Sequence, residues 1–281
     1  MTSTAPPPRR TPMGQAPDIL LRITAQRRER YGIAPGKLDL GVAPSAGPGD
    51  QPALVSAVAN PFLAAIAAHR GRAIIAEIKL GSPRLGSLRG TFDPEAHARA
   101  YAESGAVALS VVVEPDSFFG SYDLLRRCRA ASGLPTIAKD FVVTTRQLDE
   151  AKAAGADAVL LIASLYDGGT LRRLAEAARR LGLAPLIETH DRGDVEKLEG
   201  AEWELVGVNN RDLRTFIVNL SHSISLQPHL PAGALKVAES GLRTAADLGR
   251  LRKAGFDAFL VGESLITTPD PTTKLRELLS R

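Results

Sequence analysis

Eight polar residues stand at the ends of short apolar runs in this chain of 281 residues. The runs include AIIAEIK (73–79), PTIAKDF (135–141) and LKVAESG (235–241), and each is too short and too β-branched for a free-standing helix. A strand that is buried on both faces of a parallel sheet reads as such an apolar run. Burial alone does not select the polar residues that end these runs, which are Glu77, Lys79, Lys139, Glu188, Asn209, Arg211, Glu239 and Ser240.

Several of these side chains could transfer protons. Burial depresses the pKa of a lysine, so Lys139 could donate a proton or form a Schiff base. Glu188 could act as a general base. Glu77 and Lys79 are two residues apart, so they share one face of their strand. Simple ion pairs among these groups are the alternative interpretation, and Asp140 should point to the opposite face and be structural.

Two further residues could orient a substrate. Asn209 can hold an oxygen atom without titrating, and the planar fork of Arg211 matches a carboxylate or a phosphate. Asn210 and Asp212 alternate with them along the chain, so we expect these two residues to shape the loop instead.

The apolar runs alternate with helical patterns eight times, which indicates βαβ units and a parallel sheet. The segment AGADAVLLIASL (154–165) is echoed by AGFDAFLVGESL (254–265), four units later. These patterns predict an α/β fold, a closed (β/α)8 TIM barrel, with its active site at the C-terminal ends of the strands. The strands are expected near 73–79, 107–114, 135–139, 157–163, 184–189, 204–209, 234–239 and 258–262, and the following helices near 94, 121, 144, 169, 191, 219, 244 and 270.

Small residues at the ends of the seventh and eighth strands suggest a phosphate site. Backbone N–H groups can approach a phosphate at Gly241 and in the segment Gly262–Glu263–Ser264, and barrels often bind phosphate after these strands. Tight left-handed turns without a ligand are the alternative. Ser82 lies in a long loop with three glycines, residues 80–94, which is a candidate lid.

Two aromatic residues follow the second strand. Phe118 and Phe119 could form a wall for an aromatic substrate, or they could pack beneath the neighbouring loop.

The length suits one domain, because such barrels take about 250 residues. The Pro-rich residues 1–16 are predicted to be a disordered tail. Residues 17–281 are predicted to form the barrel domain, with a helical extension (17–72) ahead of the barrel (73–281). Within the extension we expect helices at 17–32 and 60–71 and a loop at 34–50.

Composition excludes several classes of partner. The net charge is +4 and aromatic residues make up only 5% of the chain, which argues against nucleic-acid binding. No apolar stretch reaches the roughly 18 residues of a transmembrane helix, so we expect no membrane. The five histidines do not cluster with carboxylates, so we expect no metal. The single cysteine, Cys128, fits a reducing cytoplasm. A monomer or a weak homo-oligomer is expected.

The motifs, taken in order, are similar to those of a known family. IIAEIK, FDP, FFGSYDLL, KDF, GADAVLLI, PLIE, GVNNRDL, VAESG and FLVGESL all occur from about residue 73 onwards. The chain resembles indole-3-glycerol phosphate synthase from about residue 17 to its C-terminus. The resemblance implies a (β/α)8 barrel with an N-terminal helical extension over the mouth. It also implies ring closure of 1-(2-carboxyphenylamino)-1-deoxyribulose 5-phosphate to indole-3-glycerol phosphate, CO2 and water, without a cofactor.

The resemblance also implies a role for each candidate residue. Lys139 matches the general acid of ring closure, and Glu188 matches the acid/base partner in the later dehydration. Glu77 and Lys79 match a paired site, with Lys79 near the substrate carboxylate and the leaving hydroxyl. Asn209 and Arg211 match residues that orient the substrate, and Glu239 and Ser240 match site residues at the end of the seventh strand. Ser82, Gly241, Gly262 and Glu263 match the positions where the family binds phosphate.

The sequence departs from the family pattern at two places near the site. Arg84 replaces a serine in the segment SPRLG, and Val113 lies in SVVVEPD where the family often has SVLTE. A specialised paralogue that acts on a related phosphorylated substrate is therefore one alternative. A second is an aldolase-type barrel in which Lys139 forms a Schiff base. A third, a catalytically silent scaffold, predicts the loss of a proton-transfer residue, but all of them are present.

Overall fold

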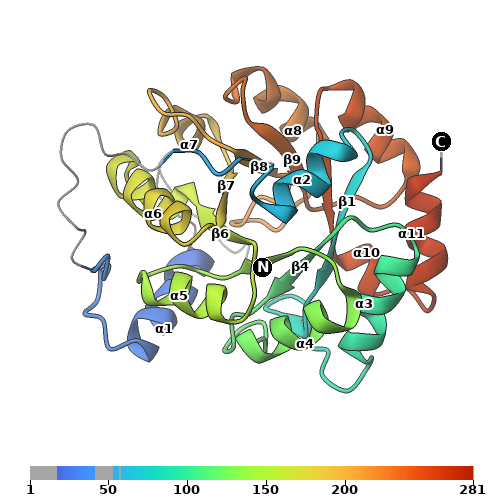
Figure 1. The fold of residues 1–281 in the computed structure, drawn as a ribbon, viewed down its shortest axis with the longest axis horizontal. Coiled ribbons are helices and arrows are strands. Elements are labelled where there is room, and N and C mark those ends of the chain that lie inside the picture. The colour runs from blue at the N-terminus through green and yellow to red at the C-terminus, as the bar shows by residue number, and fades with distance from the viewer. Residues whose placement is uncertain (1–17, 42–52, 57, 281) are drawn as a thin grey trace, which may run out of the picture.

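The computed structural model describes residues 18–41, 53–56 and 58–280, so the predicted tail at 1–16 and most of the predicted loop at 34–50 lie outside the described residues. Eight parallel strands close into a barrel in the order β1-β10-β9-β8-β7-β6-β5-β4 (Figure 1), which confirms the predicted fold. Their bounds are β1 (Ala73–Ile78), β4 (Ala108–Val112), β5 (Thr136–Lys139), β6 (Ala158–Ile162), β7 (Ala184–Thr189), β8 (Leu205–Asn209), β9 (Leu235–Glu239) and β10 (Ala258–Val261).

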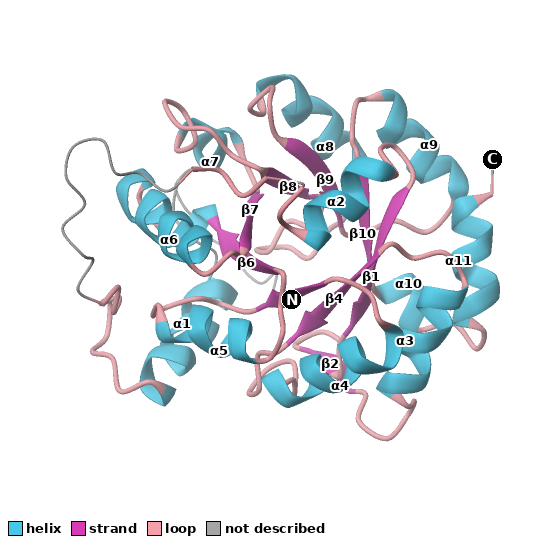
Figure 2. Cartoon of the chain, in the orientation of Figure 1, coloured by secondary structure: helices cyan, strands magenta, loops and turns pink. Residues whose placement is uncertain are grey.

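Helices follow the strands and form the outer layer (Figure 2). Each begins within two residues of its predicted start. Most of these starts carry a side-chain cap. Thr244, for example, forms a capping box with Asp247. The helices are α3 (Pro94–Glu103), α4 (Tyr122–Ser132), α5 (Arg146–Ala153), α6 (Gly168–Arg180), α7 (Arg192–Glu196), α8 (Leu220–Leu226), α9 (Ala245–Lys253) and α11 (Pro271–Leu279).

Five short elements were not predicted. The loop at 80–94 contains a small antiparallel hairpin, β2 (Gly81–Ser82) and β3 (Gly86–Ser87). A one-turn helix, α10 (Glu263–Ile266), follows β10, and two 3-10 turns span Ala163–Leu165 and Gln227–His229. Elements this short carry no periodicity that a sequence pattern can reveal.

Alternation along the strands separates two apolar layers. Ile75, Ile137 and Leu260 are fully or almost fully buried inside the barrel, whereas Ile74 and Phe259 pack outward against the helices. Side chains two residues beyond an inward apolar residue also point inward. The polar residues at the strand ends therefore converge at the barrel mouth.

The N-terminal segment supplies a helix at each end of the barrel. Helix α2 (Pro61–Ala68) lies across one end of the barrel (Figure 1). Its Phe62, Leu63 and Ile66 join the inner apolar layer. The Asn60 side chain ties this helix to the barrel by donating to the carbonyls of Asp157 and Gly182. At the other end, α1 (Asp18–Arg30) packs beside the strand ends, where the buried Arg27 pairs with Asp140.

Candidate functional site

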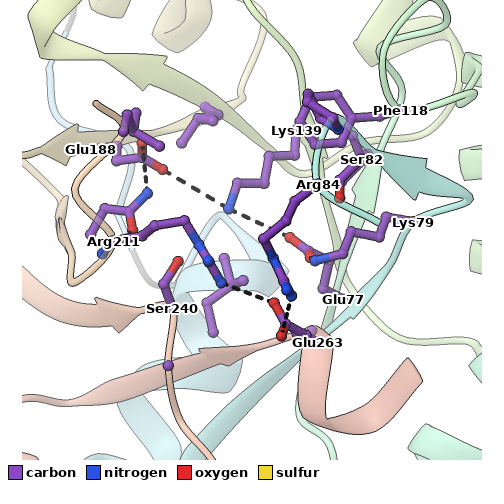
Figure 3. A pocket seen from close by; sticks show the side chains of 18 of the residues that line it. Glu77, Lys79, Ser82, Arg84, Phe118, Lys139, Glu188, Arg211, Ser240 and Glu263 are labelled. Atoms are coloured by element: carbon purple, nitrogen blue, oxygen red, sulfur yellow. Dashed lines mark hydrogen bonds and ion pairs between the residues drawn. The ribbon is translucent and has the colours of Figure 1, made fainter. Parts of the chain in front are cut away.

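A pocket that is open to solvent lies at the C-terminal ends of the strands (Figure 3). Ile19 and Ile23 of α1 form part of its wall. The pocket is lined by most of the predicted site residues: Glu77, Lys79, Ser82, Phe118, Lys139, Glu188, Asn209, Arg211, Ser240, Gly241, Gly262, Glu263 and Ser264.

Lys139 is the centre of the site. Its ammonium nitrogen lies 3.0 Å from Glu239 Oε2, 3.5 Å from Glu77 Oε2 and 3.9 Å from Glu188 Oε2. Burial lowers the pKa of Lys139, but the three carboxylates outweigh burial and raise it above the ordinary value. The expectation of a depressed lysine pKa is therefore wrong. Lys139 is a stable ammonium group that can donate a proton, rather than a free amine.

Glu77 and Lys79 form a second ion pair, with Lys79 Nζ 2.7 Å from Glu77 Oε1. Burial alone would raise the pKa of Glu77, but Lys79 and Lys139 have the larger effect and lower it to about 2. Glu77 is therefore a carboxylate between two ammonium groups (Figure 3). The arrangement holds both lysines over the same part of the pocket.

Glu188 is held by a neutral donor and by a cation. Asn209 Nδ2 donates to its Oε1 at 3.3 Å, and the Nε2 atom of His190 lies 3.1 Å from the same oxygen. Burial raises the pKa of Glu188, but His190, Lys139 and Asn209 lower it to about 2. Sequence reasoning missed His190. The only signal was its place two residues after Glu188, in the segment ETHD.

Glu239 was predicted to be catalytic, but its carboxylate lies beneath the pocket. The residue is fully buried and does not line the pocket. Burial and the nearby Glu188 carboxylate raise its pKa, although Lys139 acts in the opposite direction. Its Oε1 atom occupies the space that a β-carbon at Gly207 would need. Glu239 therefore acts on Lys139 rather than on a bound substrate.

Two arginines converge on Glu263 at the opposite side of the pocket (Figure 3). Arg211 Nη2 lies 3.0 Å from Glu263 Oε2, and Arg84 pairs with Oε1 from the tip of the β2–β3 hairpin. Arg84 was noted only as a departure from the family pattern, and the structure adds it to the site. This cationic side faces the small residues Gly241 and Gly262, which also line the pocket.

The serines on this side of the pocket differ in whether their hydroxyl proton is available to an anion. Ser264 donates its hydroxyl proton to the carbonyl of Leu242 at 2.8 Å. The Ser82 hydroxyl oxygen accepts from the Leu85 amide at 3.1 Å, which leaves its proton available. Ser240 holds a left-handed backbone with φ of 66°, a strained conformation that marks functional turns.

The two phenylalanines have different roles. Phe118 lines the pocket and stacks on Phe141, with ring centroids 5.9 Å apart. Phe119 does not line the pocket, so its predicted role as a substrate wall is wrong. Its ring packs against Gly81 and beneath the guanidinium of Arg89, where it supports the hairpin.

The residues predicted to be structural hydrogen-bond with other parts of the protein, although Asp140 also lines the pocket. Asp140 accepts from Arg27, Tyr122 and Gln147. Asn210 donates to the Glu239 carbonyl, and Asp212 accepts from backbone amides of its own loop. Within the described residues, no group of His, Cys, Asp or Glu is arranged to hold a metal ion. In the same part of the chain, no helix is long and apolar enough to cross a membrane.

Comparisons with known proteins agree with this geometry. Two indole-3-glycerol phosphate synthases are similar in sequence. The one from Carboxydothermus hydrogenoformans is 46% identical over 74% of this chain and 79% of its own length. The one from a Polaromonas species is 40% identical over 93% of this chain and 98% of its own length.

Solved structures show the same fold. The 3-hexulose-6-phosphate synthase from Salmonella typhimurium has a TM-score of 0.58 at 13% identity, and the match covers 74% of this chain and 96% of that one. A mutant tryptophan synthase α-subunit from Pyrococcus furiosus has a TM-score of 0.55 at 16% identity, with 75% and 98% covered. The sequence model described as indole-3-glycerol phosphate synthase matches residues 50–278. The chain therefore belongs to the indole-3-glycerol phosphate synthase family.

Proposed function

We propose that this protein is an indole-3-glycerol phosphate synthase of tryptophan biosynthesis, a carboxy-lyase. It converts 1-(2-carboxyphenylamino)-1-deoxyribulose 5-phosphate to indole-3-glycerol phosphate, CO2 and water. The observation that carries the proposal is the Lys139 ammonium group, which is held among Glu77, Glu188 and Glu239 opposite a pair of arginines. Family membership supports the same reaction.

In the proposed mechanism, ring closure depends on Lys139. The aromatic carbon that bears the carboxylate attacks the substrate ketone, and the ketone oxygen becomes an alkoxide. Lys139 protonates this oxygen as the C–C bond forms, and the buried carboxylates keep its ammonium group charged beforehand. Loss of the carboxylate as CO2 then restores the aromatic ring.

Dehydration is assigned to Lys79 and Glu188. Lys79 protonates the departing hydroxyl, which leaves as water, and Glu188 accepts the proton that the substrate releases. The low pKa of Glu188, near 2, supports a base that is ionised at neutral pH. Asn209 keeps the Glu188 carboxylate oriented by its hydrogen bond.

The anionic ends of the substrate are assigned to the cationic side of the pocket. We propose that Ser82, Gly241, Gly262, Glu263 and Ser264 surround the phosphate, largely through backbone N–H groups. Lys79 would lie near the substrate carboxylate, and the planar fork of Arg211 would help to orient the substrate. A phosphate held away from the reacting carbons positions the substrate without opposing the reaction.

The decisive experiment mixes the purified protein with the carboxyphenylamino-deoxyribulose phosphate, without added metal or cofactor, and follows indole fluorescence. Prompt product formation, lost in Lys139→Ala, supports both the reaction and the acid. Lys236→Ala is the matched control, because this lysine lies on β9 but does not line the pocket. Lack of product from folded protein that binds the substrate would refute the proposal and favour a specialised paralogue.

The aldolase alternative requires a neutral Lys139 amine. The three carboxylates around Lys139 disfavour that form. Borohydride reduction in the presence of substrate should therefore trap no covalent adduct. We also propose that the protein is cytoplasmic and that it forms a monomer or a weak homo-oligomer. Sedimentation of the purified protein tests the oligomeric state.

A further inference from the structure

His190 joins Glu188 to a second buried carboxylate. Its Nε2 atom lies 3.1 Å from Glu188 Oε1, and its Nδ1 atom lies 3.7 Å from Asp194 Oδ2. The side chains of both acids are only 4% exposed, and that of His190 is 12% exposed. His190 does not line the pocket, so it can influence a reaction there only through Glu188.

The surroundings of the ring favour an imidazolium. A neutral imidazole has one N–H group and presents a lone pair at its other nitrogen. Nε2 of His190 faces Glu188 Oε1, whereas Nδ1 lies 3.3 Å from Ser164 Oγ and 3.7 Å from Asp194 Oδ2. Because the Ser164 hydroxyl donates its proton to Asp194, its oxygen can only accept from Nδ1, so this nitrogen carries a proton. A second proton on Nε2 avoids a lone pair directed at Glu188. Burial disfavours the cation, but Asp194 and Glu188 outweigh it and raise the pKa of His190 to about 10.

Asp194 is itself fixed in place. The Ser164 hydroxyl and the His190 backbone N–H both donate to Oδ2, and Lys197 donates to Oδ1 at 3.0 Å. Lys197 also donates to the carbonyl of Ala163 at 2.8 Å. Asp194 therefore cannot turn away from the ring, and the ring in turn remains beside Glu188.

His190 is the nearest cation to Glu188. Asn209 is neutral, and Lys139 lies 3.9 Å away and is shared with Glu77 and Glu239. The N–H of Nε2 is not well aligned with an acceptor, so the contact with Glu188 is an ion pair rather than a good hydrogen bond. The ring therefore supplies mainly charge.

We propose that His190 is a positioning residue that keeps Glu188 ionised and directed into the pocket, ready to accept a proton during the reaction. This inference rests on the proposed function, because it assumes that Glu188 acts as a base. The titratable groups that face this pair from the surrounding elements are Glu77, Lys139, Asp194, Lys197, His222 and Glu239, and the neutral Ser164 hydroxyl also contacts the ring.

The first test is the variant His190→Gln, which retains a neutral N–H donor but removes the charge. We expect the acidic limb of the kcat–pH profile to move upward by at least about one pH unit, a tenfold loss of kcat on that limb. KM should stay the same. The matched control is His222→Gln, since His222 contacts the His190 carbonyl and no carboxylate. Its profile should not move.

An unshifted acidic limb in His190→Gln, or a change in KM alone, would overturn the inference. The second test needs neither a variant nor activity: an NMR titration of the His190 ring in the wild-type protein. The ring should stay protonated up to at least pH 8, and titration near 6.5 would also overturn the inference. A wild-type protein that makes no indole product would instead refute the proposed function, and the NMR result would still stand.

Discussion

The carboxylate of Glu77 occupies the space that a side chain at Gly262 would need. A β-carbon at residue 262 would meet Glu77 Oε1 closer than any non-bonded contact allows. Gly207 provides the same clearance for Glu239. Gly262 follows β10, next to Glu77 on β1, and Gly207 lies on β8, next to Glu239 on β9. Each glycine thus makes room for one of the carboxylates that surround Lys139.

Gly262→Ala should therefore displace Glu77 and weaken its pairing with both lysines. We expect kcat to fall and the free energy of unfolding to drop by about 1–3 kcal/mol, as for other overpacked cores. Gly249→Ala is the control, because Gly249 lies in α9 with open space around its Cα, and alanine there should stabilise the helix by about 0.5–1 kcal/mol. Urea unfolding and steady-state kinetics measure both variants. An active and equally stable Gly262→Ala protein would contradict the prediction.

Glu188→Gln keeps the shape of the side chain but removes its capacity to accept a proton. We expect kcat to fall about 10²–10⁴-fold, the usual range for a general acid or base. The fold should persist, because residues at the top face of a barrel serve function more than stability. Circular dichroism checks the fold and indole fluorescence measures turnover. Near-normal kcat would remove Glu188 from the mechanism.

The stability of the protein should depend on pH through His190. Its pKa is about 10 in the folded protein against 6.5 when unfolded, so its contribution is complete below pH 6.5 and disappears as the pH rises through 10. Glu188 has the opposite sign: its pKa falls from 4.5 to about 2, and its contribution is lost as the pH falls from 4.5 toward 2. Urea unfolding of wild type and His190→Gln at pH 6, 8 and 10 should give a difference that shrinks with rising pH. A constant difference would contradict the charged state of the ring.

The ion pair between Arg27 and Asp140 docks α1 at the barrel mouth. Both side chains are nearly fully buried, at 2% and 3% exposure. Arg27→Met should cost about 3–5 kcal/mol, because removing one partner leaves the other charge buried and uncompensated. Arg30→Met is the control on the same helix, since its pair with Asp116 is exposed and should contribute below about 1 kcal/mol. Equal costs for the two variants would refute the docking role.

The sequence was sufficient to predict the barrel and the inward-facing polar residues. Strand alternation alone places Glu77, Lys139 and Glu188 on the inner face, and the strand bounds agree with those expected to within two residues. The pattern could not give the protonation states. Whether burial or charge dominates at Lys139 depends on distances to carboxylates on three other strands, and those distances exist only in the folded barrel.

Contacts between loops were also beyond the sequence. Phe118 and Phe119 are adjacent and identical in type, yet only Phe118 lines the pocket. The left-handed backbone at Phe119, with φ of 60°, turns that residue toward the hairpin. Likewise, nothing in the segment SPRLG indicates that Arg84 reaches Glu263, which lies on α10 at the far end of the chain.

Arg84→Ser tests what the second arginine contributes to substrate binding. Arg84 and Arg211 share Glu263, so the loss of Arg84 reduces the positive charge on this side of the pocket while Arg211 remains paired. The substrate carries its charge in the ground state and in the transition state alike. We therefore expect KM to rise with little change in kcat, the signature of lost uniform binding. Arg89→Ser is the control, because Arg89 lies on the same loop as Arg84 but contacts Phe119 and does not line the pocket. The rise in KM should diminish as ionic strength increases, since salt screens a partly exposed charge. A fall in kcat at constant KM would instead assign Arg84 to the closure of the hairpin over the reacting groups.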